Sequence, residues 1–593
     1  MGIGFMKDTM HTNLVDLLQF RALITPDLKM YTYLVDGEHQ EVSMTASELN
    51  KRAMAIASTL HARSKTYKTA LLLYPTGLEF IAGFMGCLYA GIIPIPAYPP
   101  HMRRPTPRLD AIIRSARTEI ALSTAKLIAD VLPNVSEDSL LSGMAFMATD
   151  TIDDSNMFFC MPCKAEDIAF LQYTSGSTAD PKGVMVSHGN LIHNMSLIAK
   201  YFQLSEQTRI VNWLPAYHDM GLIGQLLMAL HLGCELIYMS PVSFMQKPVR
   251  WLEAISRYRA TYSGGPNFAY ELCAEKFNAE TDGDVDLTSW QLAFNGAEPV
   301  REETLHTFIR TFTPYGFQAK SLVPSYGLAE GTLYVSGYKR EHPYTTLWLD
   351  AESLERDLAI VVTKETLYAR AVVGCGILVP EQRTVIVHPQ KGELCGELMI
   401  GEIWVSGPSV AQGYWEHPEA TQLTFQGTLD SCQGERFLRT GDLGFIHDNE
   451  LYITGRMKDV MIVGGRNIYP QDLEYTVQNC HPAVRKEYIA AFQVDVNGHQ
   501  KEIAGSSGEI VIVAELNREF RHRGQDGESA DQRNVHLHRE VLATARQAVW
   551  EQYELPLKDL VLIRTGTIPK TSSGKIQRRL TKQWYETDKL QRG

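Results

Sequence analysis

The chain lacks the cysteine pattern of a disulfide-stabilised secreted protein. Its 593 residues contain only 9 cysteines, which are scattered apart from one close pair, Cys160 and Cys163. Scattered thiols are typical of a reducing compartment. A zinc site or a thioredoxin-like centre needs a second matching pair or a characteristic surrounding pattern, and the sequence has neither. The cysteines therefore indicate a reducing compartment rather than a redox or metal function.

An excess of positive charge and a long uninterrupted apolar run are also missing. The formal net charge is −12, and a negative surface repels nucleic acid. The apolar stretch at residues 80–98 contains glycines and ends near Pro94 and Pro96, which predicts a buried helix running into a strand rather than a membrane span. The first residues have no apolar core long enough for a signal peptide. We expect a soluble cytoplasmic protein with no nucleic-acid partner and no stable membrane insertion.

The length and the apolar periodicity predict a large α/β protein with two or more domains. A chain of 593 residues exceeds what one hydrophobic core supports. Short apolar runs alternate with amphipathic stretches through the first two thirds, which is typical of repeated strand and helix units. The runs that we expect to form strands are TALLLY (69–74), IIPIPAY (92–98), IALST (120–124), IAFLQYT (168–174), RIVNWLP (209–215), CELIYMS (234–240), ATYSGGP (260–266) and LAFNGAE (292–298).

The last third of the chain has a different pattern of predicted secondary structure. From about Gly396, closely spaced β-like segments with turn signals predict a smaller β subdomain. The strand-like GEIVIVAEL (508–516) and an amphipathic helix from Val535 to about Gln552 belong to a separate unit. We therefore expect a large domain of mixed α/β layers with a β subdomain over residues 1–455, and a small, mobile α+β C-terminal domain over residues 456–593.

A loop of hydroxyl-bearing residues and glycine follows the run at 168–174. Residues 173–183 read YTSGSTADPKG, in which hydroxyl groups donate hydrogen bonds, glycine lets backbone N–H groups approach closely, and one lysine supplies positive charge. The spacing differs from G-x-x-x-x-G-K-[ST], so a kinase-like loop is disfavoured. The loop predicts polyphosphate binding, although ordinary surface turns have a similar composition. The residues expected to contact phosphate are Thr174, Ser175, Gly176, Ser177, Thr178 and Lys182.

Seven further segments, together with this loop, follow the order of motifs in one enzyme superfamily. They are WLPAYHDMGL (213–222), NGAEPV (295–300), PSYGLAEGT (324–332), GEIWVSGPSVAQGYW (401–415), FLRTGDLGF (437–445), GRMKD (455–459) and PKTSSGKIQR (569–578). Over nearly its whole length the chain resembles the adenylate-forming superfamily of acyl-CoA synthetases, luciferases and nonribosomal adenylation domains. One segment alone is a weak signal, whereas all of them in family order are specific. The resemblance implies ATP and Mg²⁺ as cofactors.

The resemblance also implies a nucleoside site. Tyr326 presents an aromatic face to adenine, and Ile453 lies on the opposite face. Asp442 accepts hydrogen bonds from both ribose hydroxyls, and Arg456 donates to the same sugar. The other residues implied to line the nucleotide are Gly296, Ala297, Glu298, Ser325 and Gly327.

Three residues carry the implied chemistry. Glu330 is the magnesium ligand, a hard oxygen donor that keeps the ion on the phosphates. Lys575 bridges the substrate carboxylate and the α-phosphate and stabilises the charge of the pentacoordinate transition state. His218 gates the carboxylate end of the acid site. The cations around the lysine are typical of a solvated basic tail, namely Lys570, Arg578, Arg579 and Lys582.

Two details resemble the fatty acyl-AMP ligase branch of the superfamily. The sequences of the motifs PAYHDMGL, NGAEPV and YGLAE are similar to those of that branch. Ala329 stands where most of the superfamily has a threonine that contacts phosphate. The chain is also long between Glu330 and Gly376, which implies an insertion near residues 336–371. Docked on the small domain, an apolar insertion disfavours the arrangement that accepts coenzyme A. A hairpin without such a role is the alternative.

The segment after His218 is rich in methionine, leucine and isoleucine. Adaptable apolar walls suit an alkyl tail, although such a stripe is also typical of plain helix core. The expected substrate-binding residues are His218, Met220, Gly221, Ile223, Leu227 and Met228.

The predicted function is ATP-dependent activation of a medium- or long-chain fatty acid to fatty acyl-AMP with release of pyrophosphate. The acyl group then passes to the phosphopantetheine thiol of an acyl carrier protein. Two alternatives stay open, a long-chain fatty acyl-CoA ligase and a non-catalytic nucleotide-binding scaffold. The joint presence of Lys182, Glu330, Asp442, Arg456 and Lys575 disfavours the scaffold.

Overall fold

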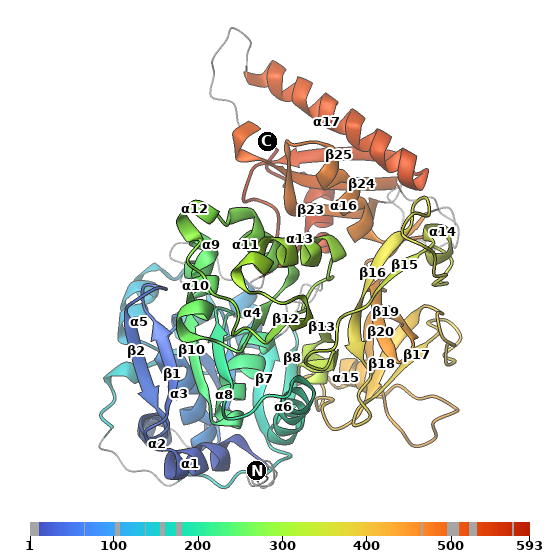
Figure 1. Cartoon of the computed structure of the whole chain (residues 1–593). Coiled ribbons are helices and arrows are strands. Elements are labelled where there is room, and N and C mark those ends of the chain that lie inside the picture. The colour runs from blue at the N-terminus through green and yellow to red at the C-terminus, as the bar shows by residue number, and fades with distance from the viewer. Residues whose placement is uncertain are drawn as a thin grey trace.

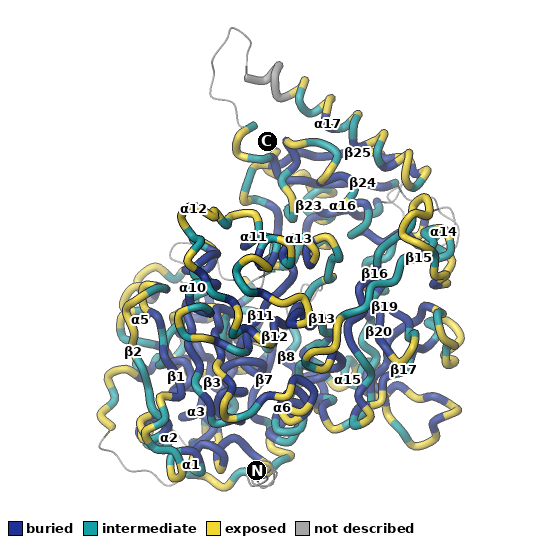
Figure 2. The backbone as a smooth tube through the Cα atoms, viewed as in Figure 1, coloured by how far each residue is buried: buried dark blue, intermediate teal, exposed yellow. Residues whose placement is uncertain are grey.

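A computed structural model of the chain describes residues 11–63, 66–100, 107–136, 138–154, 160–173, 181–463, 466–494, 509–520, 530–571 and 574–592. A small C-terminal domain, orange to red in Figure 1, lies on one end of a large N-terminal domain. The interior of both domains is buried and the exposed residues lie on the periphery (Figure 2). The mixed α/β class predicted from the sequence is confirmed.

The largest sheet runs through the middle of the large domain. Its first half has the order β2-β1-β10-β9-β11-β12-β13, in which every pair is parallel except β1 with β2. The bounds are β1 Lys29–Leu34, β2 Glu41–Thr45, β9 Arg209–Asn212, β10 Glu235–Met239, β11 Tyr262–Gly265, β12 Leu292–Asn295 and β13 Leu322–Gly327. These strands read as apolar runs because helices cover parallel sheets on their faces. The helices here include α1 Leu14–Ile24, α6 His188–Phe202, α8 Met228–Leu232, α9 Pro241–Gln246, α10 Val249–Tyr258, α11 Asn267–Lys276, α12 Ala279–Asp282 and α13 Glu302–Phe312.

A second parallel sheet holds the first predicted strands. Its order is β4-β3-β5-β6, with bounds β3 Thr69–Leu72, β4 Ile93–Pro96, β5 Ile120–Ser123 and β6 Ala145–Ala148. The apolar stretch at residues 80–98 forms the buried helix α3 Leu78–Tyr89 and then β4, as predicted. Helices α2 Ala46–Arg63, α4 Pro107–Ala116 and α5 Ala125–Val131 accompany this sheet, and the hairpin of β7 Ile168–Tyr173 and β8 Gly183–Ser187 frames the predicted phosphate loop. All eight runs predicted to form strands contain one.

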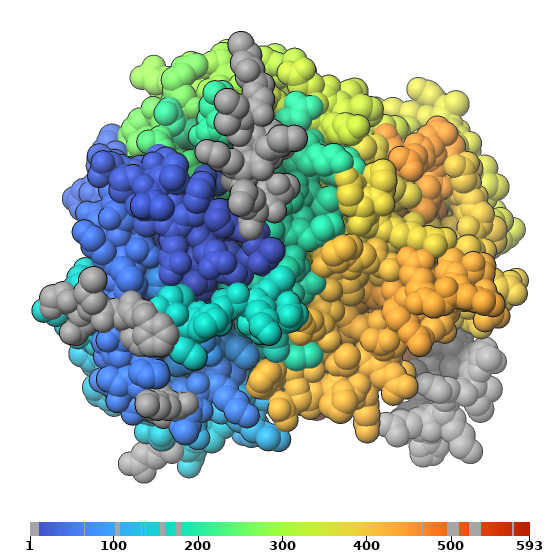
Figure 3. All heavy atoms as spheres, turned by 90° about the horizontal axis from the view of Figure 1, so that it is seen from below, coloured from blue at the N-terminus to red at the C-terminus, as the bar shows by residue number. Residues whose placement is uncertain are grey.

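Beyond β13 the large sheet continues as antiparallel strands. The order is β13-β14-β16-β20-β19-β18-β17, and β15 pairs with β16 off this path. The bounds are β14 Tyr334–Gly337, β15 Thr346–Leu349, β16 Arg370–Ile377, β17 Arg383–Val387, β18 Gly401–Ser406, β19 Leu438–His447 and β20 Glu450–Arg456, with helix α15 at Pro418–Phe425. This part is the predicted β subdomain. Seen from below, its yellow and orange atoms share one face with the blue N-terminal segment and with teal residues of the first third of the chain (Figure 3).

The small domain has its own hydrophobic core, formed by buried residues between Met461 and Leu562. It contains the sheet β23-β24-β25 and two helices packed against one another, α16 and α17, of which α17 lies outermost in Figure 1. The bounds are β21 Met461–Val463, β22 Arg466–Ile468, α16 Pro470–Cys480, β23 Val484–Val494, β24 Glu509–Leu516, α17 Ala530–Tyr553, β25 Leu557–Ile563 and α18 Arg578–Glu586. The boundary predicted between residues 455 and 456 falls at the last residue of β20, which ends at Arg456.

The segment expected as an insertion lies between β14 and β16. It contains β15 and the short helix α14 Ala351–Leu354. Leu349 and Leu354 are buried in a cluster that also holds Tyr452 of β20 and Tyr469 of the small domain. The segment therefore packs against both domains.

No helix in the described part of the chain is both long and apolar enough to span a lipid bilayer.

Candidate functional site

A cleft of about 1420 Å³ lies between the two domains, outside the carboxyl ends of β12 and β13. This position is where open α/β sheets bind ligands. Both domains contribute to its walls, from Tyr326 on β13 to Lys575 on the small domain. The cleft therefore collects residues that the sequence separates by up to several hundred positions.

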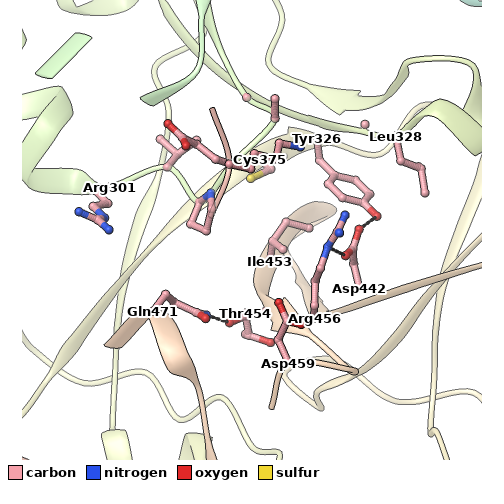
Figure 4. A pocket seen from close by; sticks show the side chains of 18 of the residues that line it. Arg301, Tyr326, Leu328, Cys375, Asp442, Ile453, Thr454, Arg456, Asp459 and Gln471 are labelled. Carbon is pink, nitrogen blue, oxygen red and sulfur yellow. Dashed lines mark hydrogen bonds and ion pairs between the residues drawn. The ribbon is translucent and has the colours of Figure 1, made fainter. Parts of the chain in front are cut away.

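The expected nucleoside residues meet on one wall of the cleft. The Tyr326 hydroxyl donates to Asp442 Oδ2 at 2.7 Å, and Arg456 Nε donates to Asp442 Oδ1 at 2.9 Å. Asp442 and Arg456 stand opposite one another on the paired strands β19 and β20, and Ile453 lies on the same hairpin. Figure 4 shows the three polar side chains pointing toward one another beside Ile453. The pairing of two adjacent strands thus fixes the carboxylate and the guanidinium in one place.

Burial and charge act together on this wall. Asp442 is buried, and its negative charge raises the pKa of Arg456 above the ordinary value. Burial, followed by the nearby Asp442 charge, raises the pKa of Tyr326 well above its ordinary value. Tyr326 therefore stays a neutral hydrogen-bond donor, and Asp442 stays paired with a permanent cation.

The turn after β12 approaches the base site through its backbone. A Cβ at Gly296 would lie 2.8 Å from the Ser325 carbonyl oxygen, and a Cβ at Gly327 would lie 1.8 Å from the Leu333 oxygen, so both positions require glycine. Ala297 has φ of 70°, in the left-handed region. The Glu298 carboxylate accepts from Phe268 N at 2.7 Å, at the first turn of α11. Its side chain therefore supports the fold at the cleft rather than pointing freely into it.

The expected phosphate loop is framed by β7 and β8. Residues Thr174, Ser175, Gly176, Ser177 and Thr178 lie outside the described residues, so the structure does not address their predicted contacts. Lys182, the residue before β8, lines the cleft, and its Nζ lies 5.0 Å from the centroid of the Tyr414 ring. Among the described residues Lys182 has no ion-pair partner, which leaves its charge available to an anion.

Glu330 lies on the cleft wall beside Lys182 and Tyr414. The Tyr414 hydroxyl donates to Glu330 Oε1 at 2.7 Å, whereas Oε2 has no hydrogen-bond or ion-pair partner in the part of the chain that the structure describes. The described residues contain no group of three or more His, Cys, Asp or Glu able to enclose a metal, and Cys160 and Cys163 are free thiols. One carboxylate facing a phosphate site fits Mg²⁺, which is usually held by one or two carboxylates and the substrate phosphates.

Lys575 reaches the cleft from a tight loop of the small domain. Its backbone N donates to Thr571 Oγ1 at 3.0 Å, and Thr571 N donates to the Lys575 oxygen at 2.8 Å. Burial, then the charge of Arg456, lowers the pKa of Lys575, and Asp219 and Glu298 oppose this shift. The small-domain ammonium therefore stands among charged groups of the large domain.

Two cations near Lys575 make specific contacts within the protein. Arg578 donates from Nε to Glu474 Oε1 at 2.6 Å and from Nη2 to Glu474 Oε2 at 2.7 Å, and its Nη1 donates to Asp459 Oδ2 at 3.2 Å. The Lys570 ammonium lies 3.4 Å from the centroid of the Tyr488 ring. These two cations are thus partners of the fold rather than members of a solvated tail.

His218 begins a short helix at the mouth of the apolar part of the cleft. Its Nδ1 lies 2.7 Å from Asp219 Oδ1, which also accepts from Met220 N at 2.7 Å. Burial raises the pKa of Asp219, but His218 and, from the other domain, Lys575 lower it more in total. Asp219 is therefore an anion that faces the small-domain lysine.

The expected substrate-binding residues divide into two groups. His218 and Met220 line the cleft, and Gly221 lies where a Cβ would approach the Pro215 oxygen to 2.3 Å. The structure does not bring Ile223, Leu227 and Met228 to the cleft, because all three are fully buried in the main core. Residues 222–227 form a π-helix, which turns side chains away from the positions of an ordinary α-helix. The apolar walls come instead from Ile198, Phe202, Gly224, Tyr262, Phe294, Leu333 and Tyr334.

Several cleft residues were missed in the sequence. Tyr414 lies within the quoted segment 401–415, but the segment alone gives no sign that its side chain meets Glu330. Arg108, at the start of α4, lines the cleft without an ion-pair partner among the described residues. It comes from a helix with no recognised motif. Asp219 stands in the quoted PAYHDMGL segment, and its residue type next to His218 was an available signal.

Polar contacts hold the small domain over the cleft. Arg370 Nη1 lies 2.6 Å from Asp472 Oδ2, and Gln471 Nε2 donates to the Thr454 oxygen at 2.7 Å (Figure 4). Arg301 and Glu487 form a further ion pair between the domains. Lys575 therefore reaches the cleft because distant charged pairs set the orientation of its domain.

The segment expected as an insertion supplies more of these contacts. Arg466 Nη1 lies 3.3 Å from Glu355 Oε2, and Asn467 Nδ2 donates to Asp357 Oδ1 at 3.0 Å. Asn467 N also donates to the Glu355 oxygen at 3.1 Å. The segment thus binds the small domain by its backbone as well as by its charges.

Comparisons with known proteins agree with this geometry. Residues 21–415 match the family model of the AMP-binding enzymes. The medium-chain-fatty-acid–[acyl-carrier-protein] ligase JamA of Moorena producens (strain JHB) is 41% identical over 575 residues, which cover 96% of this chain and 94% of that protein. The long-chain-fatty-acid–AMP ligase FadD23 of Mycobacterium tuberculosis (strain CDC 1551 / Oshkosh) is 33% identical over 572 residues, 93% of each chain.

A solved structure extends the similarity to the fold. The crystal structure of a fatty acyl-adenylate ligase from L. pneumophila, in complex with acyl adenylate and pyrophosphate, has a TM-score of 0.75 and 37% identity, and covers 98% of this chain and 97% of that chain. The resemblance inferred from the motifs is confirmed. The chain belongs to the AMP-binding enzyme family, in the fatty acyl-AMP ligase branch of the adenylate-forming superfamily.

Proposed function

We propose that the protein activates a medium- or long-chain fatty acid with ATP and passes the acyl group to an acyl carrier protein. The observation that carries this proposal is the cleft itself, which is lined by the nucleoside wall, by Lys182, by an apolar recess and by Lys575. The names of two relatives, a fatty-acid–[acyl-carrier-protein] ligase and a fatty-acid–AMP ligase, support the same reaction. We place the enzyme in the cytoplasm.

In this proposal the large domain holds the nucleoside. Adenine lies between Tyr326 and Ile453, and Asp442 and Arg456 bind the ribose. The Asp442 carboxylate is prepared for this role because two neighbours already orient it. The backbone of the β12 and β13 turns completes the wall through Gly296, Ala297, Glu298, Ser325 and Gly327.

In the same proposal the polyphosphate lies beside Lys182 and Glu330. The loop at residues 174–178 and Lys182 bind its oxygens, and Glu330 holds Mg²⁺. When bound, the ion neutralises charge on the phosphate oxygens. The protein's own part is to keep Lys182 and Glu330 on the same side of the cleft.

In the first half-reaction a fatty-acid carboxylate oxygen attacks the α-phosphorus, and the bond to the pyrophosphate oxygen breaks. Lys575 lies between the two reacting groups and stabilises the negative charge that gathers on the pentacoordinate phosphorus. Burial in a closed cleft strengthens this interaction. His218 stands where the alkyl recess opens toward the phosphate site and orients the carboxylate.

In the second half-reaction the phosphopantetheine thiol attacks the acyl carbon, a thioester forms and AMP leaves. Lys575 fills the cleft in the arrangement of this structure, so the small domain must rotate before a thiol enters. The segment at residues 336–371 bonds to the small domain through Glu355 and Asp357. We propose that these contacts disfavour the arrangement that accepts free coenzyme A.

Product analysis tests this function. The purified protein is incubated with ATP, Mg²⁺ and fatty acids of increasing length, alone, with coenzyme A, or with a phosphopantetheinylated carrier protein. Mass spectrometry should detect acyl-AMP in the first two mixtures and acylated carrier in the third. Acyl-CoA as the main product would favour the CoA-ligase alternative, and no acyl-AMP with any acid would favour the scaffold.

A further inference from the structure

A short extended segment, residues 411–415, runs between the strand that leaves the phosphate loop and Glu330. Its backbone is hydrogen-bonded on both sides. Trp415 N donates to the Gly183 oxygen of β8 at 2.8 Å, and Ala411 N donates to the Glu330 oxygen at 2.9 Å. The segment therefore joins the two places where the polyphosphate and its cation are expected to bind.

Tyr414, in the middle of this segment, contacts both partners with one side chain. Its hydroxyl donates to Glu330 Oε1 at 2.7 Å, and the Lys182 ammonium lies 5.0 Å from the ring centroid. A hydrogen bond to a carboxylate is charge-assisted, and the face of an aromatic ring attracts a cation. The ring thus links a positive and a negative group that would otherwise pair only through a ligand.

The Tyr414 ring is itself fixed. It is 8% exposed and packs edge-on against Phe425, with centroids 5.2 Å apart. Its backbone N donates to Thr421 Oγ1 at 2.9 Å, which holds the residue at the entry of α15. A side chain fixed by ring packing on Phe425, at a residue whose backbone is also hydrogen-bonded, can orient others rather than follow them.

Glu330 depends on this tyrosine for orientation. Among the described residues the Tyr414 hydroxyl is the only side-chain donor to the Glu330 carboxylate, and Oε2 is left without a partner. Ala329, the residue before Glu330, has no hydroxyl to contribute. The bond to Oε1 therefore decides which way the second oxygen points.

We propose that Tyr414 is a positioning residue that sets the separation of Glu330 and Lys182, so that the metal and the polyphosphate bind as one unit. The proposal deepens the proposed function and rests on it for the identity of the ligand, Mg²⁺ with ATP. The two halves of the side chain act separately. The hydroxyl orients the metal ligand, and the ring face orients the phosphate lysine.

This division gives two variants with different signatures. Tyr414→Phe keeps the ring beneath Lys182 and removes the bond to Glu330, so the Mg²⁺ concentration for half-maximal ATP binding should rise about tenfold, the effect of one lost hydrogen bond to a charged group. ATP binding measured in EDTA should stay unchanged. Tyr414→Leu removes the ring as well, and ATP binding in EDTA should then also weaken, by about three- to fivefold.

Isothermal titration of ATP into the full-length protein, at a series of Mg²⁺ concentrations and without fatty acid, measures both effects apart from catalysis. Tyr201→Phe is the matched control, because the Tyr201 hydroxyl also donates to a carboxylate, Glu381 Oε2 at 2.8 Å, with Lys200 near its ring at 5.4 Å, but outside the cleft. The control should leave both titrations unchanged. Thermal unfolding of each variant shows whether the fold is kept.

An unchanged Mg²⁺ dependence in folded Tyr414→Phe would overturn the role of the hydroxyl. Equal weakening of both variants in EDTA would overturn the division between hydroxyl and ring. Failure of the proposed function looks different, because the wild-type protein would then bind Mg²⁺ and ATP normally but form no acyl-AMP.

Discussion

Asp442 and Lys575 reach the same cleft by different routes. Asp442 lies on β19 of the large domain, opposite Arg456 on β20, and Tyr326 and Arg456 already hold its carboxylate. Lys575 stands on a loop of the small domain, and only contacts such as Arg370 with Asp472 bring that loop over the cleft. The first group is fixed by local strand pairing and the second by the orientation of a whole domain.

The difference separates binding from chemistry. We expect a wall built within one domain to keep its shape whether the cleft is open or closed, and we therefore expect nucleotide affinity to depend mainly on the large domain. A charge delivered from the other domain acts only while the domains are closed. Variants on the two sides should therefore change different measured quantities.

The largest effect should come from Lys575→Ala. Removing a cation that stabilises charge in the transition state is expected to slow adenylate formation by roughly 10²–10³-fold. ATP affinity, measured by titration without fatty acid, should change little. Lys582→Ala is the control for fatty-acid-dependent pyrophosphate exchange, because Lys582 lies further along α18 and is not among the residues that line the cleft. An unaltered exchange rate in Lys575→Ala would remove the lysine from the mechanism.

Asp442→Asn tests the other side of the comparison. The amide keeps the shape but loses the charge that pairs with Arg456, so AMP affinity should fall by about tenfold or more. Asp448→Asn, in the exposed turn between β19 and β20, is the matched control. If Asp442→Asn slowed the chemical step and left AMP affinity intact, the assignment of binding to the large domain would be wrong.

Gly224→Val should change the enzyme's preference for acid length without affecting nucleotide binding. Gly224 and Leu333 both line the apolar recess, and a Cβ at Gly224 would stand 3.2 Å from Leu333 Cδ2. Filling this space should lower kcat/KM for the longest acids by about tenfold relative to short ones.

The same acid panel should show no change of preference in Gly143→Val, where no atom lies within 4 Å of an added Cβ. An equal loss of kcat/KM for acids of all lengths in Gly224→Val would mean that the recess does not determine the preferred length of the acyl chain.

The smallest effect concerns pH and the domain contact. Burial, followed by the negative charge of Glu487 across the interface, raises the pKa of Glu271 from 4.5 to about 7. The folded protein then keeps a proton that the unfolded chain loses between these values, so this group's contribution to stability falls as pH rises toward 7. Glu271→Gln should therefore raise the unfolding temperature at about pH 8.5, and raise it less at about pH 5.5, where only part of this penalty is present.

Differential scanning fluorimetry at the two pH values measures this difference. Glu275→Gln is the control, because the Glu275 side chain is 61% exposed and pairs with Lys276. Stabilisation of Glu271→Gln that is equal at both pH values would contradict a titrating carboxyl.

The sequence predicted where strands and helices lie better than it predicted which of their side chains line the cleft. Apolar runs such as residues 168–174 and 292–298 form strands, because a strand that is buried on both of its faces requires apolar side chains at successive positions. Ile223, Leu227 and Met228 were equally apolar, but the π-helix at residues 222–227 directs them into the core. Periodicity does not reveal a local change of helix type, so the recess walls had to come from the structure.

The motifs predicted which residues meet, but not what holds them. Tyr326, Asp442 and Arg456 lie together in the structure; the register of β19 and β20 sets Asp442 opposite Arg456, and the fold brings Tyr326 of β13 to the same carboxylate. The contacts that orient the small domain join residues such as Arg301 and Glu487, which belong to no motif and lie far apart in the chain. Long-range charge pairs leave no periodic signal in a sequence.

The position of Arg578 has a consequence for the timing of the cycle. Two nitrogens of its guanidinium donate hydrogen bonds to Glu474 of α16. The third donates to Asp459, which lies in the turn just after β20. Lys575 lies only three residues earlier, so any bend at that turn carries the lysine along with it. In the proposed reaction the ammonium would therefore leave the acyl-adenylate together with the rest of its domain, so withdrawal of the lysine and exposure of the product would be a single event.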